Sequence, residues 1–304
     1  QLKINISTDS LNLAKQGSFT ESSLLARSLT VLAGPFANFL MAVFIFASLS
    51  QIAGTPSNDP IIGKVAKLPE AQISLAVGDR ILSIEGKEVK KFSQVYDIVS
   101  NIDKLSNINF RVERNGQSFD LIIRHLFPPI VFNVEMFSPA MKAGVQVGDV
   151  FLTANNKNVA SFDELKDIIN ASKSMAVSIV IWRNGETVEM IMTPEMRPTE
   201  TQTGKFVEEM RIGVRGGSIL SPTMKIPSIF ESITIGVEMT IYIVQTSLTG
   251  LISIIEKTIS PKHLSGPVGV AKALSYSASE GFIPFLSLVA AISAGIGLIN
   301  LFPI

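Results

Sequence analysis

The chain has 304 residues, which is enough for two or three domains, and its 26 basic and 26 acidic side chains give a formal net charge of zero. This balance gives no net positive charge that would attract nucleic acid. The absence of cysteine excludes disulfides and thiolate metal sites. Apolar residues make up 46% of the chain against 17% charged residues, and a lipid bilayer is the simplest place to bury that excess.

The two ends of the chain suggest that it continues in both directions. It starts at Gln1 rather than Met, and it stops at Ile304 inside an apolar run. We therefore expect a fragment of a longer protein, in which residues 1–28 form a membrane-proximal segment.

The first membrane element is predicted over residues 29–52. No charged side chain occurs between Ser28 and Asn58, and about 20 apolar residues are enough for a helix to cross a bilayer. A buried helix of a large soluble protein is the alternative, but charge-free runs of this length are typical of membrane spans.

A polar block follows at residues 59–217, and it contains an internal repeat. The spacing between matching motifs stays at 69 to 70 residues. The matched motifs are Gly78-Asp79 with Gly148-Asp149, Phe92 with Phe162, Asp97-Ile98 with Asp167-Ile168, and Arg114-Asn115-Gly116 with Arg183-Asn184-Gly185. A register that holds over several separate motifs predicts two tandem copies of one small α+β unit, at residues 59–126 and 127–217.

Each copy has the same expected elements. The Gly-Asp pair introduces a strand over residues 81–84 or 150–154, and Asn-Gly marks a two-residue hairpin turn. Between them lies a helix, which we expect to be capped by Ser93 in the first copy and by Ser161 in the second.

Two further apolar stretches complete the chain. Residues 226–258 contain Glu231 and Glu238, seven residues apart and so near one helix face, which favours an amphipathic helix on the membrane surface over a span. Residues 281–304 carry no charge and are rich in small residues, which predicts a transmembrane helix packed against other helices.

Several motifs in this order resemble known proteins. Residues 138–150 read SPAMKAGVQVGDV, which is similar to the signature of bacterial PDZ domains, and the first copy matches it less well. Residues 33–39 read AGPFANF, residues 264–271 read LSGPVGVA and residues 300–304 read NLFPI. The order of a span, paired PDZ-like units and these flanking motifs resembles the site-2 protease family.

The resemblance implies a multi-domain membrane protein with transmembrane helices and two tandem α+β PDZ domains. Such domains bind an extended peptide as an added strand at a sheet edge. The implied peptide-binding strands precede each signature, and their candidate groove residues are Ile61, Ile62, Val65, Ile130, Val131 and Val134. PDZ units that act only as spacers are the alternative.

The same resemblance implies a zinc protease that works inside the membrane. Family members hold zinc through two histidines of an HExxH helix and an aspartate of an LDG motif. This chain has only His125 and His263, and neither sits in such a motif, so we expect no metal ligand and no catalytic residue here. The HExxH helix is expected before Gln1 and the LDG motif after Ile304.

Three residues of the spans are expected to contact substrate. The resemblance places Asn38, in the AGPFANF motif, beside the catalytic centre, although a bridge to another helix would equally satisfy a buried amide. Asn300 and Pro303 lie where the last helix should end, since proline disfavours a helical residue before it. This irregular backbone could pair with an unwound substrate strand, or it could be a simple helix end.

The implied function is regulated cleavage of single-span membrane substrates such as anti-sigma factors. The PDZ pair would filter or dock the shortened substrate on the periplasmic side of the bacterial inner membrane. A non-catalytic membrane adaptor that binds peptide tails is the alternative, and the HExxH and LDG motifs would distinguish the two.

Overall fold

The computed structural model describes residues 23–69, 74–103, 106–124, 126–201, 203–264 and 266–302. The chain divides into two compact units. Unit 2 consists of Gly54–Ile226 and Thr249–Ala273, and unit 1 consists of the remaining segments.

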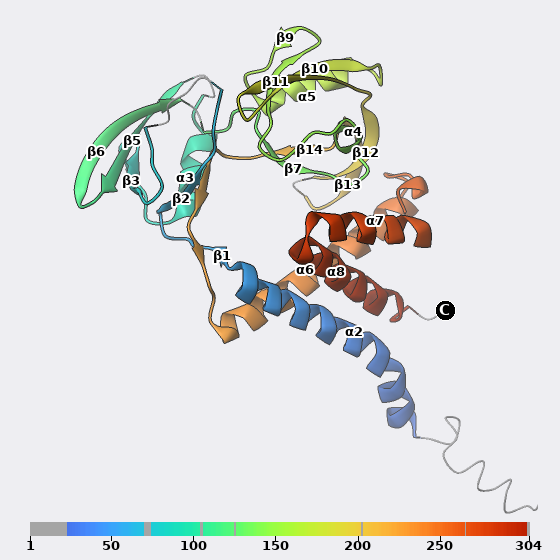
Figure 1. The fold of residues 1–304 in the computed structure, drawn as a ribbon. Coiled ribbons are helices and arrows are strands. Elements are labelled where there is room, and N and C mark those ends of the chain that lie inside the picture. Colours follow the sequence, from blue (N-terminus) through green and yellow to red (C-terminus); the bar gives the residue numbers. More distant parts are fainter. Residues whose placement is uncertain are drawn as a thin grey trace, which may run out of the picture. The chain divides into compact units, whose positions relative to one another are not determined.

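Unit 1 is built from helices (Figure 1). Its elements are α2 (Leu24–Ala53), the first part of α6 (Ile229–Ile255), the last part of α7 (Pro267–Glu280) and α8 (Phe282–Ile299). Ala42 of α2 and both Ala290 and Ala294 of α8 are fully buried, and these small residues let the two helices approach closely. Gly236 brings α6 close to α2, because a side chain there would collide with the backbone of Val43.

Three helices of the described chain are long and apolar enough to cross a membrane, namely α2, α6 and α8. The spans predicted over residues 29–52 and 281–304 overlap α2 and α8. Helix α6 was expected on the membrane surface, and its length and composition also allow a span. Glu238 is exposed in the middle of this helix, so its surface placement stays a prediction.

The first repeat unit, module 1, is an antiparallel sheet covered by one helix (Figure 1). The strand order is β4 (Lys87–Glu88), β3 (Arg80–Ile84), β5 (Asn107–Arg114) and β6 (Gln117–Arg124). Helix α3 (Phe92–Ser100) buries Phe92, Val95 and Val99, which lie on one helical face. A separate strand, β2 (Ile62–Val65), adds the fully buried Ile62 to the same core.

The second unit, module 2, repeats this arrangement. Its sheet order is β11 (Glu186–Met192), β10 (Val177–Arg183), β8 (Val150–Ala154) and β9 (Lys157–Asn158). Helix α5 (Phe162–Ala171) and strand β7 (Val131–Val134) correspond to α3 and β2, and a short helix α4 (Pro139–Lys142) follows β7. Module 2 also carries a hairpin of β12 (Glu195–Glu200) and β13 (Phe206–Arg211).

The two modules are nested in the chain. Strand β14 (Val214–Gly216) pairs with β7 and completes module 2, and β15 (Leu220–Pro222) then pairs with β2 and completes module 1. Both pairings are antiparallel, and both shift register before their last residue pair. The sequence placed the first unit in residues 59–126, and β15 adds to it a strand from beyond module 2.

Short elements complete unit 2. Strand β16 (Met224–Lys225) pairs with β1 (Thr55–Pro56), so the chain enters and leaves the modules through one two-stranded ladder. A single 3₁₀ turn, η1 (Pro261–His263), lies in the segment that joins α6 to α7.

The repeated Gly-Asp and Arg-Asn-Gly motifs are joined by a buried ion pair in each module. Arg114 Nε donates to Asp79 at 2.6 Å, and Arg183 Nε donates to Asp149 at 2.7 Å. The two aspartates are 0% and 1% exposed. Burial would raise the pKa of Asp79, but hydrogen bonds from Arg114 and from the N–H of Ala76 outweigh it and hold the pKa below its ordinary value.

Local predictions for the two copies had different outcomes. The Asn-Gly turns are confirmed, because Asn115, Gly116, Asn184 and Gly185 all have positive φ between paired strands. The Ser161 cap is also confirmed.

The predicted Ser93 cap is wrong. The cap residue of α3 is Lys91, and Phe92 is the first helical residue. The Gln94 side chain accepts the N–H groups of Lys90 and Lys91 at 2.8 and 3.0 Å. These bonds satisfy donors before Ser93 and set the start of the helix earlier.

Candidate functional site

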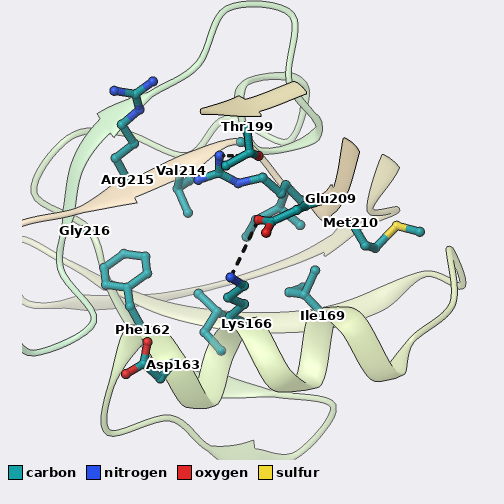
Figure 2. A pocket seen from close by; sticks show the side chains of 14 residues that line it. Phe162, Asp163, Lys166, Ile169, Thr199, Glu209, Met210, Val214, Arg215 and Gly216 are labelled. Atoms are coloured by element: carbon teal, nitrogen blue, oxygen red, sulfur yellow. Dashed lines mark hydrogen bonds and ion pairs between the residues drawn. The ribbon is translucent and has the colours of Figure 1, made fainter. Parts of the chain in front are cut away.

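A groove in module 2 lies between helix α5 and strands β13 and β14 (Figure 2). Its volume is about 340 Å³. The lining residues from α5 are Phe162, Asp163, Leu165, Lys166 and Ile169, and the opposite wall consists of Thr199 and residues 209–216.

Helix α5 forms one wall because both its start and its buried face are fixed. Ser161 Oγ accepts the N–H of Glu164 at 3.3 Å, and Glu164 in turn accepts the N–H of Ala160 at 2.7 Å. Leu165 and Ile169 are buried in the core of module 2. The helix is thereby held with Phe162 and Lys166 directed toward the strands, as Figure 2 shows.

Strand β14 forms the other wall, and two glycines determine its path. Gly213, just before the strand, has a φ of +78°, and a side chain there would collide with Ser138. Gly216 lies against the ring of Phe162, so a side chain would collide with it. Gly216 thus brings β14 close to α5, and Gly213 brings the start of the strand close to Ser138.

The edge of β14 that faces away from β7 carries free backbone groups. Val214 lies opposite Val134, and the N–H of Glu135 donates to the carbonyl of Gly213 at 2.9 Å. In an antiparallel ladder this pattern makes Val214 and Val134 a pair without mutual hydrogen bonds, so the N–H and C=O of Val214 point away from β7. Within the described residues, neither group has a hydrogen-bond partner.

Charged side chains lie at the rim of the groove. Lys166 Nζ of α5 is 3.6 Å from a carboxylate oxygen of Glu209 on β13, so this ion pair crosses from one wall to the other (Figure 2). Glu135 is 3.1 Å from Arg197 and 3.7 Å from each of Arg211 and Arg215. Arg197 is also 2.6 Å from Glu195, and Arg215 is 69% exposed, with its side chain directed away from α5 (Figure 2).

This geometry is suited to an extended chain segment. The outward N–H and C=O of Val214 can pair with one backbone residue of an added strand, while the ring of Phe162 and the side chain of Ile169 offer apolar contact. The groove therefore combines an open strand edge with a partly apolar floor.

Module 1 has the same edge, but its own side chains close it. The equivalent of Val214 is Leu220, whose N–H donates to Ser218 Oγ at 3.1 Å and whose carbonyl accepts the Tyr96 hydroxyl at 3.1 Å. Burial raises the pKa of Tyr96, which keeps that hydroxyl protonated as a donor. Pro222 stands where module 2 has Gly216, and it offers no N–H to an added strand.

The six groove residues expected from the sequence lie elsewhere in the modules. Ile62, Ile130 and Val131 are buried, and Ile61, Val65 and Val134 are half-buried. They belong to or flank β2 and β7, the partners of the closing strands, and none of them lines the groove of module 2. Their role in peptide binding stays a prediction.

Sequence reasoning missed the residues that form this groove. Phe162 was noted only as a repeat position, and Lys166 and Val214 were not singled out. The available signal was the glycine pair Gly213 and Gly216 beside a short apolar strand, since such glycines indicate close backbone approach. The repeat did not reveal this strand, because its motifs are 69 to 70 residues apart. The matching strand of module 1 instead follows Val214 by only six residues, at Leu220.

The expected substrate contacts of the spans lie in unit 1. Asn38 is half-buried, its backbone carbonyl accepts the Ser293 hydroxyl at 3.0 Å, and a side chain at Gly297 would press on it. Asn300 is exposed directly after the end of α8 at Ile299. Pro303 lies outside the described residues. Contact of these residues with substrate stays a prediction.

No metal site is found among the described residues. They contain no group of three histidine, cysteine, aspartate or glutamate side chains that could hold an ion. His263 Nε2 is 3.2 Å from Glu208, and His125 lies outside the described residues. The described residues therefore do not fit a zinc site.

Comparison with known families decides the assignment. The family model "Peptidase family M50" matches residues 5–304. The chain belongs to this family. The match covers the apolar helices and both modules, and it bears out the resemblance to site-2 proteases.

Individual relatives agree with the family. The chain is 29% identical over 316 residues to the "Regulator of sigma E protease" of Haemophilus influenzae, covering 95% of this chain and 70% of that protein. It is 25% identical over 316 residues to the "Regulator of sigma-E protease RseP" of Escherichia coli, covering 94% and 69%. It is 27% identical over 322 residues to a "Putative zinc metalloprotease" of Vibrio cholerae, also covering 94% and 69%.

Among the solved structures that overlap a part of the chain is a PDZ domain. The PDZ domain of an SdrC-like protein from Listeria monocytogenes shows a TM-score of 0.23 and 17% identity, covering 29% of this chain and 84% of that one.

Proposed function

We propose that this protein is an intramembrane zinc metalloendopeptidase whose module 2 docks an extended segment of its substrate. The family match over residues 5–304 and the three membrane-length helices support a protease at the membrane. The open edge of Val214 above the groove is the observation that supports docking. The names of the bacterial relatives support single-span substrates of the anti-sigma type.

The two modules are proposed to be PDZ domains on the periplasmic side of the inner membrane. Their strand order, helix position and closing strands fit a permuted PDZ arrangement, in which a ligand strand adds between the closing strand and the helix. In this proposal module 2 binds peptide, and module 1 supports it structurally because its own edge is closed.

The chemistry is proposed to depend on zinc held by residues outside Gln1–Ile304. Zinc in such enzymes lowers the pKa of a bound water and polarises the scissile carbonyl. Asn38, Asn300 and Pro303 are proposed to hold the substrate rather than the metal.

Docking is tested by placing a tyrosine in module 2 at the position that matches Tyr96, whose hydroxyl closes the edge of module 1. Tyr96 and Lys166 occupy equivalent helix positions, so Lys166→Tyr should place a hydroxyl near the free carbonyl of Val214. Peptides selected from a displayed library on the full-length protein should bind Lys166→Tyr at least about tenfold more weakly. The control Lys157→Tyr lies outside the groove and should bind like the parent. Equal binding by both variants would contradict docking in this groove.

Catalysis is tested with purified variants and a single-span model substrate. Asn300→Ala and Pro303→Ala should reduce substrate cross-linking and cleavage while zinc content stays unchanged. His125→Ala and His263→Ala should also retain zinc. Loss of zinc in a histidine variant would place the metal site in this chain. A protein that binds peptides but never cleaves the substrate would instead support the membrane adaptor.

A further inference from the structure

Strand β13 carries two neighbouring glutamates with different partners. Glu209 pairs with Lys166 across the groove at 3.6 Å. Glu208 accepts the N–H of Ser260 at 2.7 Å and lies 3.2 Å from Nε2 of His263. Successive side chains of a strand leave opposite faces, so β13 separates the groove from the segment that contains Ser260 and His263.

This segment, residues 258–264, joins α6 to α7. Thr258 closes the end of α6 through its N–H and hydroxyl, which donate to the carbonyl of Ser253 at 2.9 and 3.0 Å. Ile259 is 6% exposed, so the segment is packed rather than free in solvent. Glu208 is the residue of β13 that lines the cavity beside the segment.

The contact of Glu208 with Ser260 and His263 is sensitive to small displacements of β13. One carboxylate oxygen of Glu208 serves both Ser260 and His263. Glu208 and His263 are 26% and 30% exposed, so water screens their interaction less than it screens a pair on the open surface. A displacement of the β13 backbone would weaken both interactions at once.

The hairpin that carries these residues is an addition to the repeated fold. Strands β12 and β13 pair only with each other, and the described part of module 1 has no equivalent hairpin. Module 1 forms its sheet, helix and closing strand without one. The hairpin is therefore available for a role other than building the module.

We propose that the β12–β13 hairpin couples ligand binding in the groove to the packing of residues 258–264 against β13. These residues lead into α7. This inference rests on the proposed docking of peptide in module 2. An extended chain beside β14 meets the Lys166–Glu209 pair that crosses the groove, and separating the pair moves β13. Glu208 moves with the strand and releases Ser260 and His263. Because coupling between two sites is reciprocal, loosening this segment also changes the groove.

The first test perturbs the groove and measures the segment. Lys166→Glu places a second carboxylate beside Glu209 and should push β13 away from α5. Hydrogen exchange of the full-length protein should then be about fivefold or more faster in residues 258–264. Lys157→Glu makes the same charge change on β9, outside the groove, and should leave this segment unchanged.

The second test perturbs the segment and measures the groove. Glu208→Ala removes both interactions, and Glu208→Gln keeps an oxygen acceptor for Ser260 but removes the carboxylate beside His263. Exchange in residues 212–216 should rise in both variants, more in Glu208→Ala, and should not rise in the control Glu189→Gln on β11. Exchange that matches the controls in both tests would overturn the coupling.

Neither hydrogen-exchange test needs a ligand. The coupling can therefore fail or succeed independently of the peptide-binding test of docking. Coupling without selectable peptides would refute the proposed docking and leave the hairpin as a connection between the two faces of β13. Selectable peptides without coupling would leave docking intact and refute this inference.

Discussion

Modules 1 and 2 share their strand order, their buried Asp-Arg pair and even the register shift in their closing strands, yet their edges differ. Leu220 of module 1 has both outward backbone groups bonded to Ser218 and Tyr96. The same groups of Val214 in module 2 have no partner among the described residues.

The difference comes from a few side chains rather than from the fold. Tyr96 on α3 reaches the closing strand, whereas the equivalent Lys166 on α5 turns to Glu209 of the added hairpin. Pro222 removes a donor where Gly216 keeps one. A repeated fold can therefore keep its strand order and lose or gain a binding edge through substitutions at a few positions.

The largest loss of stability is expected from breaking the buried Asp-Arg pair that both modules share. Asp149→Ala removes the partner of a half-buried Arg183 and three hydrogen bonds, so module 2 should lose about 3–5 kcal/mol of stability. Trp182 of β10 is the only tryptophan of the chain, so its fluorescence reports module 2 in urea titrations of residues 54–226. The control Asp167→Ala, on the exposed face of α5, should unfold like the parent.

A smaller loss is expected from the turn before each Asp. Gly148 has a φ of +95° and Gly78 a φ of +93°, a region that disfavours a β-branched side chain. Gly148→Val should destabilise module 2 by about 1–3 kcal/mol, measured by the same fluorescence. The neighbouring control Val147→Ala changes an exposed side chain. An unchanged midpoint for Gly148→Val would show that the turn tolerates the side chain.

The closed edge of module 1 can be opened by removing one oxygen. Tyr96→Phe leaves the carbonyl of Leu220 without its donor and should cost about 1 kcal/mol. Amide hydrogen exchange of residues 219–221 should rise, while the Trp182 transition of module 2 stays in place. If exchange in β15 is unaffected, the hydroxyl is not what holds this edge.

The smallest effect is expected on the pH dependence of the stability of module 1. The pKa of Asp79 is lowered in the folded state, so its stabilising contribution is complete above the unfolded pKa of about 3.9 and is lost as the pH falls through the folded pKa. Module 1 should therefore lose stability only below about pH 4. Asp79→Asn should flatten this dependence in urea titrations followed by circular dichroism at pH 3 and pH 5.

Local features of the modules could be predicted from the sequence because short-range chemistry determines them. The Asn-Gly turns, the strand at residues 150–154 and the Ser161 cap need only neighbouring residues. The cap of α3 was misplaced because the position that matches Ser161 is Lys91 rather than Ser93, and the Gln94 side chain bonds the N–H groups before the helix.

The candidate groove could not be predicted in the same way. It depends on a strand that closes each module from far along the chain, and on which side chain of a helix reaches that strand. The repeat spacing of 69 to 70 residues breaks at this point, since β14 and β15 follow each other directly. The apolar helices and the packing of α8 through small residues such as Gly297 were predictable from composition, whereas the close approach of α6 to α2 at Gly236 emerged only from helix packing.

The nesting of the modules has a consequence for how the protein folds. Val65 cannot pair with Leu220 until the whole of module 2 has been synthesised, and the entropy of closing that long loop opposes the pairing. If module 2 folds first, β7 and β14 hold the two ends of the insertion side by side and the loop is already closed. Module 2 then acts as an internal folding template, and a variant that delays it leaves the sheet edge of module 1 exposed to other unfinished chains.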